Sequence, residues 1–449
     1  MSHFQIRISS SELRNDLVLA SGEDFRLGDI DLDRFFQISL PKRERDLVRI
    51  MMAVYIADRL IRRPRRQHDA PGSREIELQV DVADLEFWRD AHAARLMEDA
   101  MRRLSNDFWS FRFQAGHAVP QQLPLLVEAP SVCLYSAGLD SACGLCRRAR
   151  DDKSPILTVT AAYQSFHGRV REQAKRILER YGVRIRPVLC RTRLANAPRL
   201  RQQETSQRLR SALFMALGGA IASAVRADAV EVFENGVGAI NLPPQLGMML
   251  GSMATRGCHP GALMAAGRLI SHVAGRNIQF RLPMLRDTKA EAVRAIAQDG
   301  MKDLARLTMS CGHWPLRVEG PGKQCGTCFP CIGRRQALIV GGIPDAAENY
   351  AVDLFGAHQG DLYVGRALLP LKATLMQVND LRNLCETGSQ PNGFADHISE
   401  TEVCSFGMRI DEVIDLHRRY VREWQPLIGQ AKEDGVPWAS WIKRVGLAA

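Results

Sequence analysis

The chain lacks the long apolar runs, repeats and biased tracts that mark membrane, solenoid and disordered proteins. None of its apolar runs approaches the roughly 20 residues that a helix needs to cross a bilayer. The opening MSHFQIRISS also lacks the basic and then apolar layout of a secretory signal peptide. The hydrophobic content of 46% is normal for a globular protein. We therefore expect a soluble, cytoplasmic protein with no membrane association.

Aromatic residues are scarce, at 6% of the chain, and the basic residues are not interleaved with them. A nucleic-acid surface usually combines clustered basic residues with aromatic side chains. The sequence therefore disfavours nucleic acid as a partner, despite a formal net charge of +10. The densest basic run, at 62–66, precedes a Pro-Gly pair at 71–72 and indicates an exposed loop. We interpret the excess charge as a solvated basic surface.

Disulfides are not expected, although the chain has eleven cysteines, because the cytosol keeps thiols reduced. Four cysteines follow the spacing C-x13-C-x2-C-x2-C, namely Cys311, Cys325, Cys328 and Cys331. Two overlapping C-x2-C steps and one longer gap suit tetrahedral thiolate coordination, which favours Zn²⁺. Four protein ligands leave no open position, so the metal should be structural. The alternative is a chance group of buried cysteines or a redox pair.

The 449 residues are too many for one ordinary domain, and we expect three segments. Residues 1–127 form an N-terminal α+β extension without the spacing of catalytic residues, and residues 356–449 form a helical C-terminal extension. Helices are expected in these extensions at 46–60, 93–104, 368–385, 410–424 and 438–445, and strands at 76–82 and 108–113.

Residues 128–355 alternate between strand and helix patterns. Strands are expected at 131–135, 156–160, 185–189 and 229–233, and helices at 141–150, 168–181 and 207–225. This alternation is typical of a parallel sheet with crossover helices. It predicts an α/β nucleotide-binding core.

The first core strand runs into a turn of small residues and then a helix, in the sequence VCLYSAGLDS at 132–141. Backbone N–H groups and a helix N-terminus can converge on a phosphate in such a turn. The hydroxyls of Ser136 and Ser141 would add donors, and Asp140 could hold a magnesium ion or cap the helix. As a bare pattern the segment could also be an ordinary turn.

The six residues SAGLDS at 136–141 resemble the SGGxDS signature of the PP-loop ATP pyrophosphatases, which bind ATP and cleave it to AMP and pyrophosphate. Ala137 departs from the pattern, because the family has glycine there. If the backbone at this position is left-handed, alanine costs about 1 kcal/mol relative to glycine. We expect a slightly altered loop that still binds phosphate.

Three more segments are similar to the 7-cyano-7-deazaguanine synthase (QueC) branch of that family. Residues 308–311 (TMSC) and 325–337 (CGTCFPCIGRRQA) resemble its T-x-S-C and C-G-x-C-x-x-C-x-x-R-x-x-A segments. Residues 283–291 (PMLRDTKAE) resemble its P-L-x-x-x-x-K-x-E stretch. The resemblance covers residues 130 to 350 and implies a Rossmann-like fold of the HUP (adenine nucleotide alpha hydrolase-like) type, with helices on both faces of a parallel sheet.

Other segments look closer to the QueC-like proteins of anti-phage systems, such as QatC of the Qat system. They are the helix-borne RLRS at 208–211, ENG at 234–236 and TRGCHP at 255–260.

The resemblance implies a role for each motif residue. The nucleotide-binding residues would be Ser136, Ala137, Gly138, Leu139, Asp140, Ser141, Glu234, Asn235 and Gly236. The catalytic residues would be Asp140, Ser141, Lys289 and Arg210, and the substrate-binding residues Arg208, Arg256 and His259. Plainer interpretations stay open: a solvated helix charge for Arg210, a tight Asn-Gly turn at 235–236, and a structural histidine at 259.

The implied reaction is ATP-dependent adenylation of the carboxylate of 7-carboxy-7-deazaguanine, with ATP, Mg²⁺ and Zn²⁺ as cofactors. An amine would then open the adenylate, and we expect that amine to belong to a partner protein of the same defence system. One alternative is a synthase that makes free 7-cyano-7-deazaguanine from ammonia. Another is a catalytically silent scaffold that binds nucleotide within a defence complex. A tRNA-modifying PP-loop enzyme is disfavoured, because no catalytic cysteine pair or tRNA-binding module is apparent.

Overall fold

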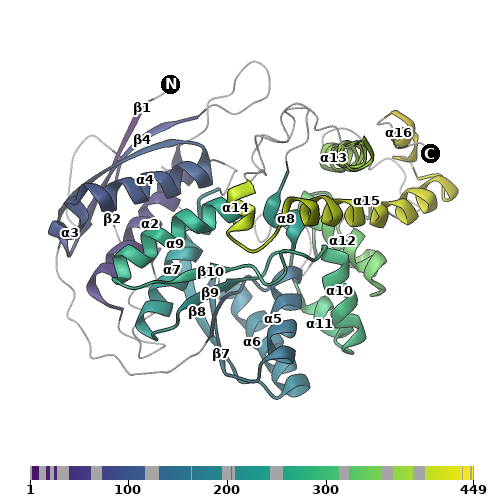
Figure 1. Cartoon of the computed structure of the whole chain (residues 1–449), viewed down its shortest axis with the longest axis horizontal. Coiled ribbons are helices and arrows are strands. Elements are labelled where there is room, and N and C mark those ends of the chain that lie inside the picture. The colour runs from purple at the N-terminus through teal and green to yellow at the C-terminus, as the bar shows by residue number, and fades with distance from the viewer. Residues whose placement is uncertain are drawn as a thin grey trace. The chain divides into compact units, whose positions relative to one another are not determined.

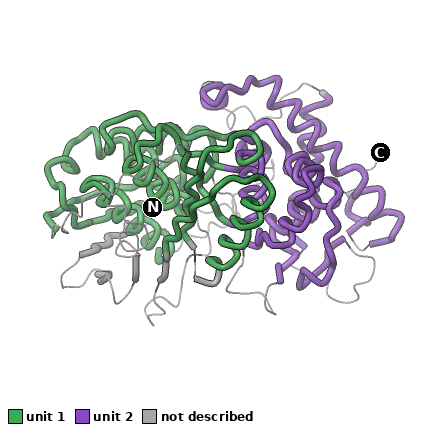
Figure 2. The backbone as a smooth tube through the Cα atoms, turned by 90° about the horizontal axis from the view of Figure 1, so that it is seen from below, with its two compact units in different colours: residues 1–136, 149–232, 250–282 green, residues 137–148, 233–249, 283–449 purple. Residues whose placement is uncertain are grey.

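The computed structural model (Figure 1) describes residues 3–9, 17–20, 25–27, 40–61, 73–116, 131–162, 164–194, 204, 208–242, 256–312, 323–355, 368–387, 400–436, 438–444 and 447. Two compact units divide the chain (Figure 2): unit 1 comprises residues 1–136, 149–232 and 250–282, and unit 2 comprises 137–148, 233–249 and 283–449. Every helix among the described residues is too short or too polar to cross a membrane. The expected segment boundaries at 127 and 355 remain a prediction. The basic run at 62–66 and Thr255 lie outside the described residues.

Unit 1 contains a six-stranded sheet with the strand order β10-β9-β6-β7-β8-β3. Its strands are β3 (Phe25–Leu27), β6 (Ser131–Leu134), β7 (Ile156–Ala162), β8 (Ile185–Leu194), β9 (Ala229–Val232) and β10 (Gln279–Arg281). All neighbouring strands run parallel, except that β3 pairs antiparallel with β8. The α/β prediction is therefore confirmed.

Helices flank this sheet (Figure 1), as crossover connections between parallel strands require. They include α6 (Gln164–Tyr181), which packs on β8, and α7 (Arg210–Ala224), which packs on β6. The approach of α7 is close, because a Cβ added at Gly218 would lie 2.5 Å from Leu134 Cδ2. All of β6 is buried, as expected of a strand covered on both faces.

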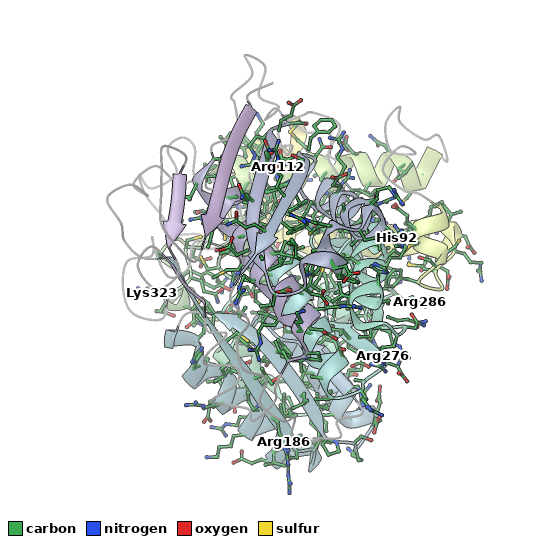
Figure 3. The ribbon with its side chains drawn as sticks, turned by 90° about the vertical axis from the view of Figure 1, so that its left-hand side faces the viewer. His92, Arg112, Arg186, Arg276, Arg286 and Lys323 are labelled. Carbon is green, nitrogen blue, oxygen red and sulfur yellow. The ribbon has the colours of Figure 1, made fainter. Side chains whose placement is uncertain are left out.

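A second sheet in unit 1 has the order β2-β1-β4-β5, with all its pairs parallel. Its elements and neighbours are β1 (His3–Ser9), β2 (Leu17–Ala20), α2 (Lys42–Leu60), β4 (Glu75–Val82), α3 (Leu85–Arg89), α4 (Ala91–Ser105) and β5 (Phe108–Ala115). The four elements predicted between 46 and 113 are confirmed within a few residues. Exposed arginines occur at separate places on unit 1, such as Arg112 and Arg186 (Figure 3).

A buried ion network joins the parts of unit 1. Arg74 donates to Asp107 Oδ2 at 2.7 Å and also pairs with Asp58, and all three side chains are inaccessible to solvent. Asp58 Oδ2 in turn accepts the backbone N–H of Leu209 at 3.3 Å. The turn that precedes α7 is therefore attached to the end of α2 and the start of β4.

Among the residues that the structure describes, the regular elements of unit 2 are helices. They are the first ten residues of α5 (Leu139–Asp151), α8 (Gly236–Ile240), α10 (Lys289–Gln298), α11 (Lys302–Leu307), α12 (Phe329–Gly341), the 3₁₀ helix η2 (Ala347–Asn349), α13 (Leu369–Thr387), α14 (Glu400–Cys404), α15 (Ile410–Glu433) and α16 (Ala439–Arg444). The predicted C-terminal helices are present, but α15 continues nine residues past the expected end at 424 and through Pro426. Its buried stripe goes on to Leu427, Ile428 and Ala431, and this packing outweighs the local effect of the proline.

Candidate active site

The backbone of the expected phosphate loop is left-handed at Ala137, with φ +58°. The Cβ of a non-glycine residue crowds the neighbouring carbonyl in this region, at a cost of about 1 to 2 kcal/mol. Ala137 is nevertheless fully buried, and α5 begins two residues later at Leu139. The turn that a glycine would favour therefore forms around an alanine.

Two hydrogen bonds within unit 2 hold this turn. The carbonyl of Ala137 accepts the backbone N–H of Met309 at 3.1 Å. The N–H of Leu139 donates to Ser310 Oγ at 3.4 Å. Ser310 donates its own N–H to the side chain of Gln324 at 3.0 Å, so the support comes from two adjoining segments of the chain.

Four side chains from three separate segments of the sequence gather at the start of α5. Lys289 Nζ lies 2.7 Å from Asp140 Oδ2, and the two side chains are 20% and 15% exposed. Asn235 Nδ2 donates both to Asp140 Oδ1 at 3.0 Å and to Glu234 Oε1 at 2.7 Å. We call Asp140, Glu234, Asn235 and Lys289 the acid–lysine cluster. It brings together predicted residues from three motifs.

Charges in the acid–lysine cluster affect one another strongly. Burial, followed by the negative charge of Asp140, raises the pKa of Glu234 to about 8. Burial alone would lower the pKa of Lys289, but the charges of Asp140 and Glu234 outweigh it and raise that pKa above its usual value. At neutral pH the cluster therefore holds the ammonium of Lys289 beside a Glu234 carboxyl group that keeps its proton. Burial and then Asp140 also raise the pKa of the Cys143 thiol, which disfavours it as a nucleophile.

The Asn-Gly turn has both a structural role and a place in the cluster. Asn235 caps α8, because its Oδ1 accepts the N–H of Gly238 at 3.0 Å. Gly236 donates its N–H to the carbonyl of Asp287 at 2.9 Å. A Cβ at Gly236 would lie 2.0 Å from the carbonyl oxygen of Leu285, so only glycine fits. The turn is thus bound directly to the segment that carries Lys289.

Lys289 is the first residue of α10, and the start of that helix is well defined. Thr288 accepts the N–H of Glu291 at 3.1 Å, and Glu291 accepts the N–H of Thr288 at 2.8 Å. This capping box fixes the helix start and hence the base of the lysine side chain. The T-x-x-E spacing at 288–291 could have been recognised in the sequence.

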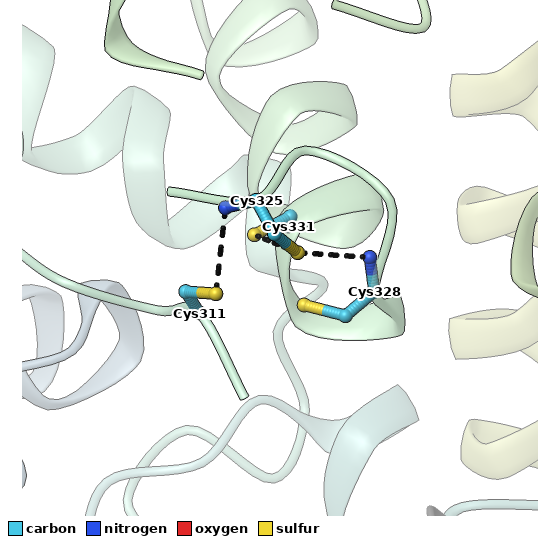
Figure 4. A group of neighbouring side chains, drawn as sticks. All are labelled: Cys311, Cys325, Cys328 and Cys331. Carbon is cyan, nitrogen blue, oxygen red and sulfur yellow. Dashed lines mark hydrogen bonds between the residues drawn. The ribbon is translucent and has the colours of Figure 1, made fainter. Parts of the chain in front are cut away.

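The four predicted metal ligands converge in unit 2 (Figure 4). Their Sγ atoms all lie within 4.8 Å of one another, and those of Cys325 and Cys331 are 3.8 Å apart. Zn–S bonds of about 2.3 Å in a tetrahedron require sulfurs about 3.8 Å apart. The N–H groups of Cys325 and Cys328 donate to the sulfurs of Cys311 and Cys325, each at 3.4 Å. The four-cysteine cluster therefore fits zinc.

Arg208 and Arg210 lie in unit 1, and only one of them is on a helix. The prediction for Arg208 is wrong in this respect, because α7 begins at Arg210 and Arg208 belongs to the preceding turn. Arg208 is buried and donates to the carbonyl of Ser105 at 3.1 Å, which holds it away from the helical path. The guanidinium carbon of Arg210 lies 5.4 Å from the centre of the Phe214 ring.

Arg256 and His259 also belong to unit 1. A Cβ at Gly257 would lie 2.8 Å from Ser211 Cβ, so the loop that contains Arg256 touches the first turn of α7. His259 caps α9 (Pro260–Ala274), and its Nδ1 accepts the N–H of Gly261 at 3.2 Å. This is the structural role considered for a histidine before proline. Substrate binding by His259, Arg256, Arg208 and Arg210 remains a prediction.

Comparison with known proteins adds a partial similarity. No family model matches the chain. The chain is 30% identical over 152 residues to a 7-cyano-7-deazaguanine synthase of Rhizobium leguminosarum bv. trifolii. This aligned region is 33% of this chain and 55% of that protein. The chain is 26% identical to the synthases of Brucella ovis and Brucella suis over 152 residues, or 33% of this chain and 56% of each of theirs. The chain thus spans about half the length of the curated relatives it matches. This weak homology supports a QueC-like relationship for about a third of the chain.

Proposed function

We propose that the chain is an ATP-dependent ligase that adenylates the carboxylate of a 7-deazaguanine, with 7-carboxy-7-deazaguanine as the substrate. A carboxylate oxygen would attack the α-phosphorus of ATP, and pyrophosphate would leave. An amine nitrogen would then attack the acyl carbon, form a C–N bond, lose a proton and release AMP. The observation that carries the proposal is the Lys289–Asp140 pair at the end of the SAGLDS loop.

The main demand of such a reaction is to neutralise the departing pyrophosphate. The backbone N–H groups at 136–141 and the hydroxyls of Ser136 and Ser141 would bind its oxygens. Lys289 would supply the positive charge, since it keeps its proton over the whole neutral range. Arg210 is proposed as a second cation, and Arg208, Arg256 and His259 as contacts to the deazaguanine.

The oxygens of the acid–lysine cluster suit Mg²⁺, and Glu234 would lose its proton on becoming a ligand. Asp140 and Glu234 accept hydrogen bonds from the same amide nitrogen, so their carboxyl groups lie on one side of Asn235. Carboxylate oxygens with phosphate oxygens are the usual ligands of this ion. When bound, magnesium would offset the negative charge of the triphosphate. Zinc would have a structural role only, because the four cysteines fill its coordination shell.

We further propose that the amine belongs to a partner protein and that the setting is an anti-phage defence system. The support is the resemblance of RLRS, ENG and TRGCHP to the defence-system proteins, together with the two extensions outside the resemblance. An acyl-adenylate accepts any well-positioned neutral amine. A protein N-terminus has a pKa of roughly 8 and would be partly neutral in the cell.

The test is to incubate the protein with ATP, Mg²⁺ and 7-carboxy-7-deazaguanine, with and without ammonia, and to identify products by mass spectrometry. AMP release that depends on the deazaguanine supports adenylation, and no AMP in any mixture refutes it in favour of a silent scaffold. Asp140→Ala should abolish AMP release, whereas Asp303→Ala, at an exposed position on α11, should not.

Intact-mass measurement of co-expressed proteins that are encoded beside this one then tests whether a partner protein receives the deazaguanine. A mass increase on one of them supports the conjugate. Free nitrile without any mass increase would identify the ammonia-dependent synthase instead.

A further inference from the structure

The C-terminal helix α15 contacts the turn on one side of the acid–lysine cluster. Leu416 is fully buried, and its Cδ2 would lie 2.5 Å from a Cβ added at Gly236. Gly236 directly follows Asn235, which holds Asp140 and Glu234. Figure 1 shows α15 passing alongside α8, the helix that Asn235 caps. Packing of α15 therefore helps to position the amide of the cluster.

The same helix contacts residues on both sides of Lys289 in the sequence. Thr288, just before the lysine, donates its hydroxyl to Glu423 of α15. Arg419, one helical turn earlier, pairs with Glu291 and donates to the carbonyl of Arg286 at 2.9 Å. Thr288 and Glu291 are the two members of the capping box at the start of α10. Polar groups of α15 thus hold the capping box from outside.

Glu423 is held on both carboxylate oxygens. One accepts from Thr288, and the other accepts the side-chain N–H of Gln336 on α12 at 3.2 Å. Burial raises the pKa of Glu423 to about 6, against the effect of these two donors and of the nearby Arg294, while Glu291 adds to the rise. A carboxyl group in such a place costs free energy of desolvation. Its geometry, with one neutral donor from the N-cap of α10 and another from α12, is that of a specific positioning contact.

We propose that α15 is a positioning element of the active site, and that Glu423, acting through Thr288, fixes the start of α10 so that Lys289 Nζ meets Asp140. What the lysine then does rests on the proposed function. Its position can be measured without any substrate. Segment 356–449 would accordingly be required for the chemistry and would not serve only for assembly.

The first test measures the reactivity of Lys289 by competitive acylation of the full-length protein, with peptide mass spectrometry and exposed Lys432 as the internal standard. Glu423→Gln should raise Lys289 acylation severalfold, because a loosened cap weakens the ion pair that protects the amine. Glu433→Gln, at an exposed position of the same helix, is the matched control and should change nothing. Thr288→Val removes the hydrogen bond to Glu423 from the other side and should give the same rise in Lys289 acylation. This second variant keeps the test decisive if Glu423→Gln fails to fold.

Equal Lys289 acylation in wild type, Glu423→Gln and Thr288→Val would overturn the proposal.

The second test is a double-mutant cycle on turnover. Glu423→Gln should lower kcat by about 10-fold to 100-fold in the wild-type background, as small misplacements of catalytic groups do. In a Lys289→Met background it should have less than about a twofold effect, because coupled residues are non-additive. An equal loss in both backgrounds would indicate general destabilisation and contradict the idea. A wild-type protein without ATP turnover would refute the proposed function, while the acylation result would still decide the positioning.

Discussion

Met309 donates its backbone N–H to the carbonyl oxygen of Ala137 across 3.1 Å, two residues before the first cysteine of the metal cluster. The next residue, Ser310, accepts the N–H of Leu139 at 3.4 Å. The segment that leads into Cys311 therefore holds the expected phosphate loop. Loss of the four-cysteine cluster should be transmitted to that loop.

We expect the purified protein to contain zinc, and Cys328→Ser to lose it. A structural zinc site supplies folding free energy, so this variant should be less stable and less soluble as well as inactive. Cys404→Ser is the control, because Cys404 is exposed and outside the cluster. Metal analysis and thermal unfolding would measure the effect. Folded wild-type protein with less than about half an equivalent of any metal would contradict the prediction.

Ala137→Gly should leave stability almost unchanged. Relief of the left-handed strain is worth about 1 to 2 kcal/mol. Loss of a buried methyl group costs about 0.8 kcal/mol of stability. Glycine also gives the unfolded chain more conformational entropy, which costs a further 0.4 to 1 kcal/mol, roughly. These effects nearly cancel at Ala137. The same change at Ala142, which is also fully buried but inside α5, has no strain to relieve and should cost about 2 kcal/mol.

Urea unfolding of the two variants in parallel would measure this difference. If Ala137→Gly lowers the free energy of unfolding as much as Ala142→Gly does, the backbone at Ala137 is not left-handed.

Much of the fold could be predicted because the core elements carry strong periodic patterns. The strands and helices expected between 131 and 225 agree with β6, β7, β8 and α7 to within a few residues. Strands β1, β2, β3 and β10 were absent from the prediction. They are only three to seven residues long, and pairing with neighbours stabilises them more than local propensity does.

The candidate site could be predicted as motifs but not as a geometry. Asp140 and Lys289 are 149 residues apart in sequence, and no local pattern indicates that they pair. Glu423 was missed for a similar reason, since a glutamate on an amphipathic helix looks like a solvated charge. Only the tertiary contact with Thr288 distinguishes it.

Arg74→Met should be strongly destabilising. It would leave the buried carboxylates of Asp58 and Asp107 without their partner, and breaking a buried pair in this way typically costs about 3 to 5 kcal/mol. Arg103→Met is the matched control, because its pair with Asp99 on α4 is well exposed and should be worth less than about 1 kcal/mol. Urea unfolding would compare them. Equal effects would show that the Arg74 network contributes no more than a surface ion pair.

Glu234 should make the protein less stable as the pH rises from about 4.5 to about 8. Burial, and then the negative charge of Asp140, raise the pKa of this carboxyl group from its ordinary value of 4.5 to about 8. Over this window the folded state binds a proton that the unfolded state has lost, so the free energy of unfolding falls with increasing pH.

Glu234→Gln cannot ionise and avoids this loss. Its stability relative to wild type should therefore rise between pH 5 and pH 8.5, by about 1.4 kcal/mol for each unit by which the folded-state pKa lies above 5. Glu348→Gln, at an exposed position of η2, is the matched control for replacing a glutamate by glutamine. Denaturant unfolding of the three proteins at both pH values gives the free energy of unfolding of each variant relative to wild type. A constant difference for Glu234→Gln would contradict the raised pKa of Glu234 and the protonated carboxyl group assigned to the acid–lysine cluster at neutral pH.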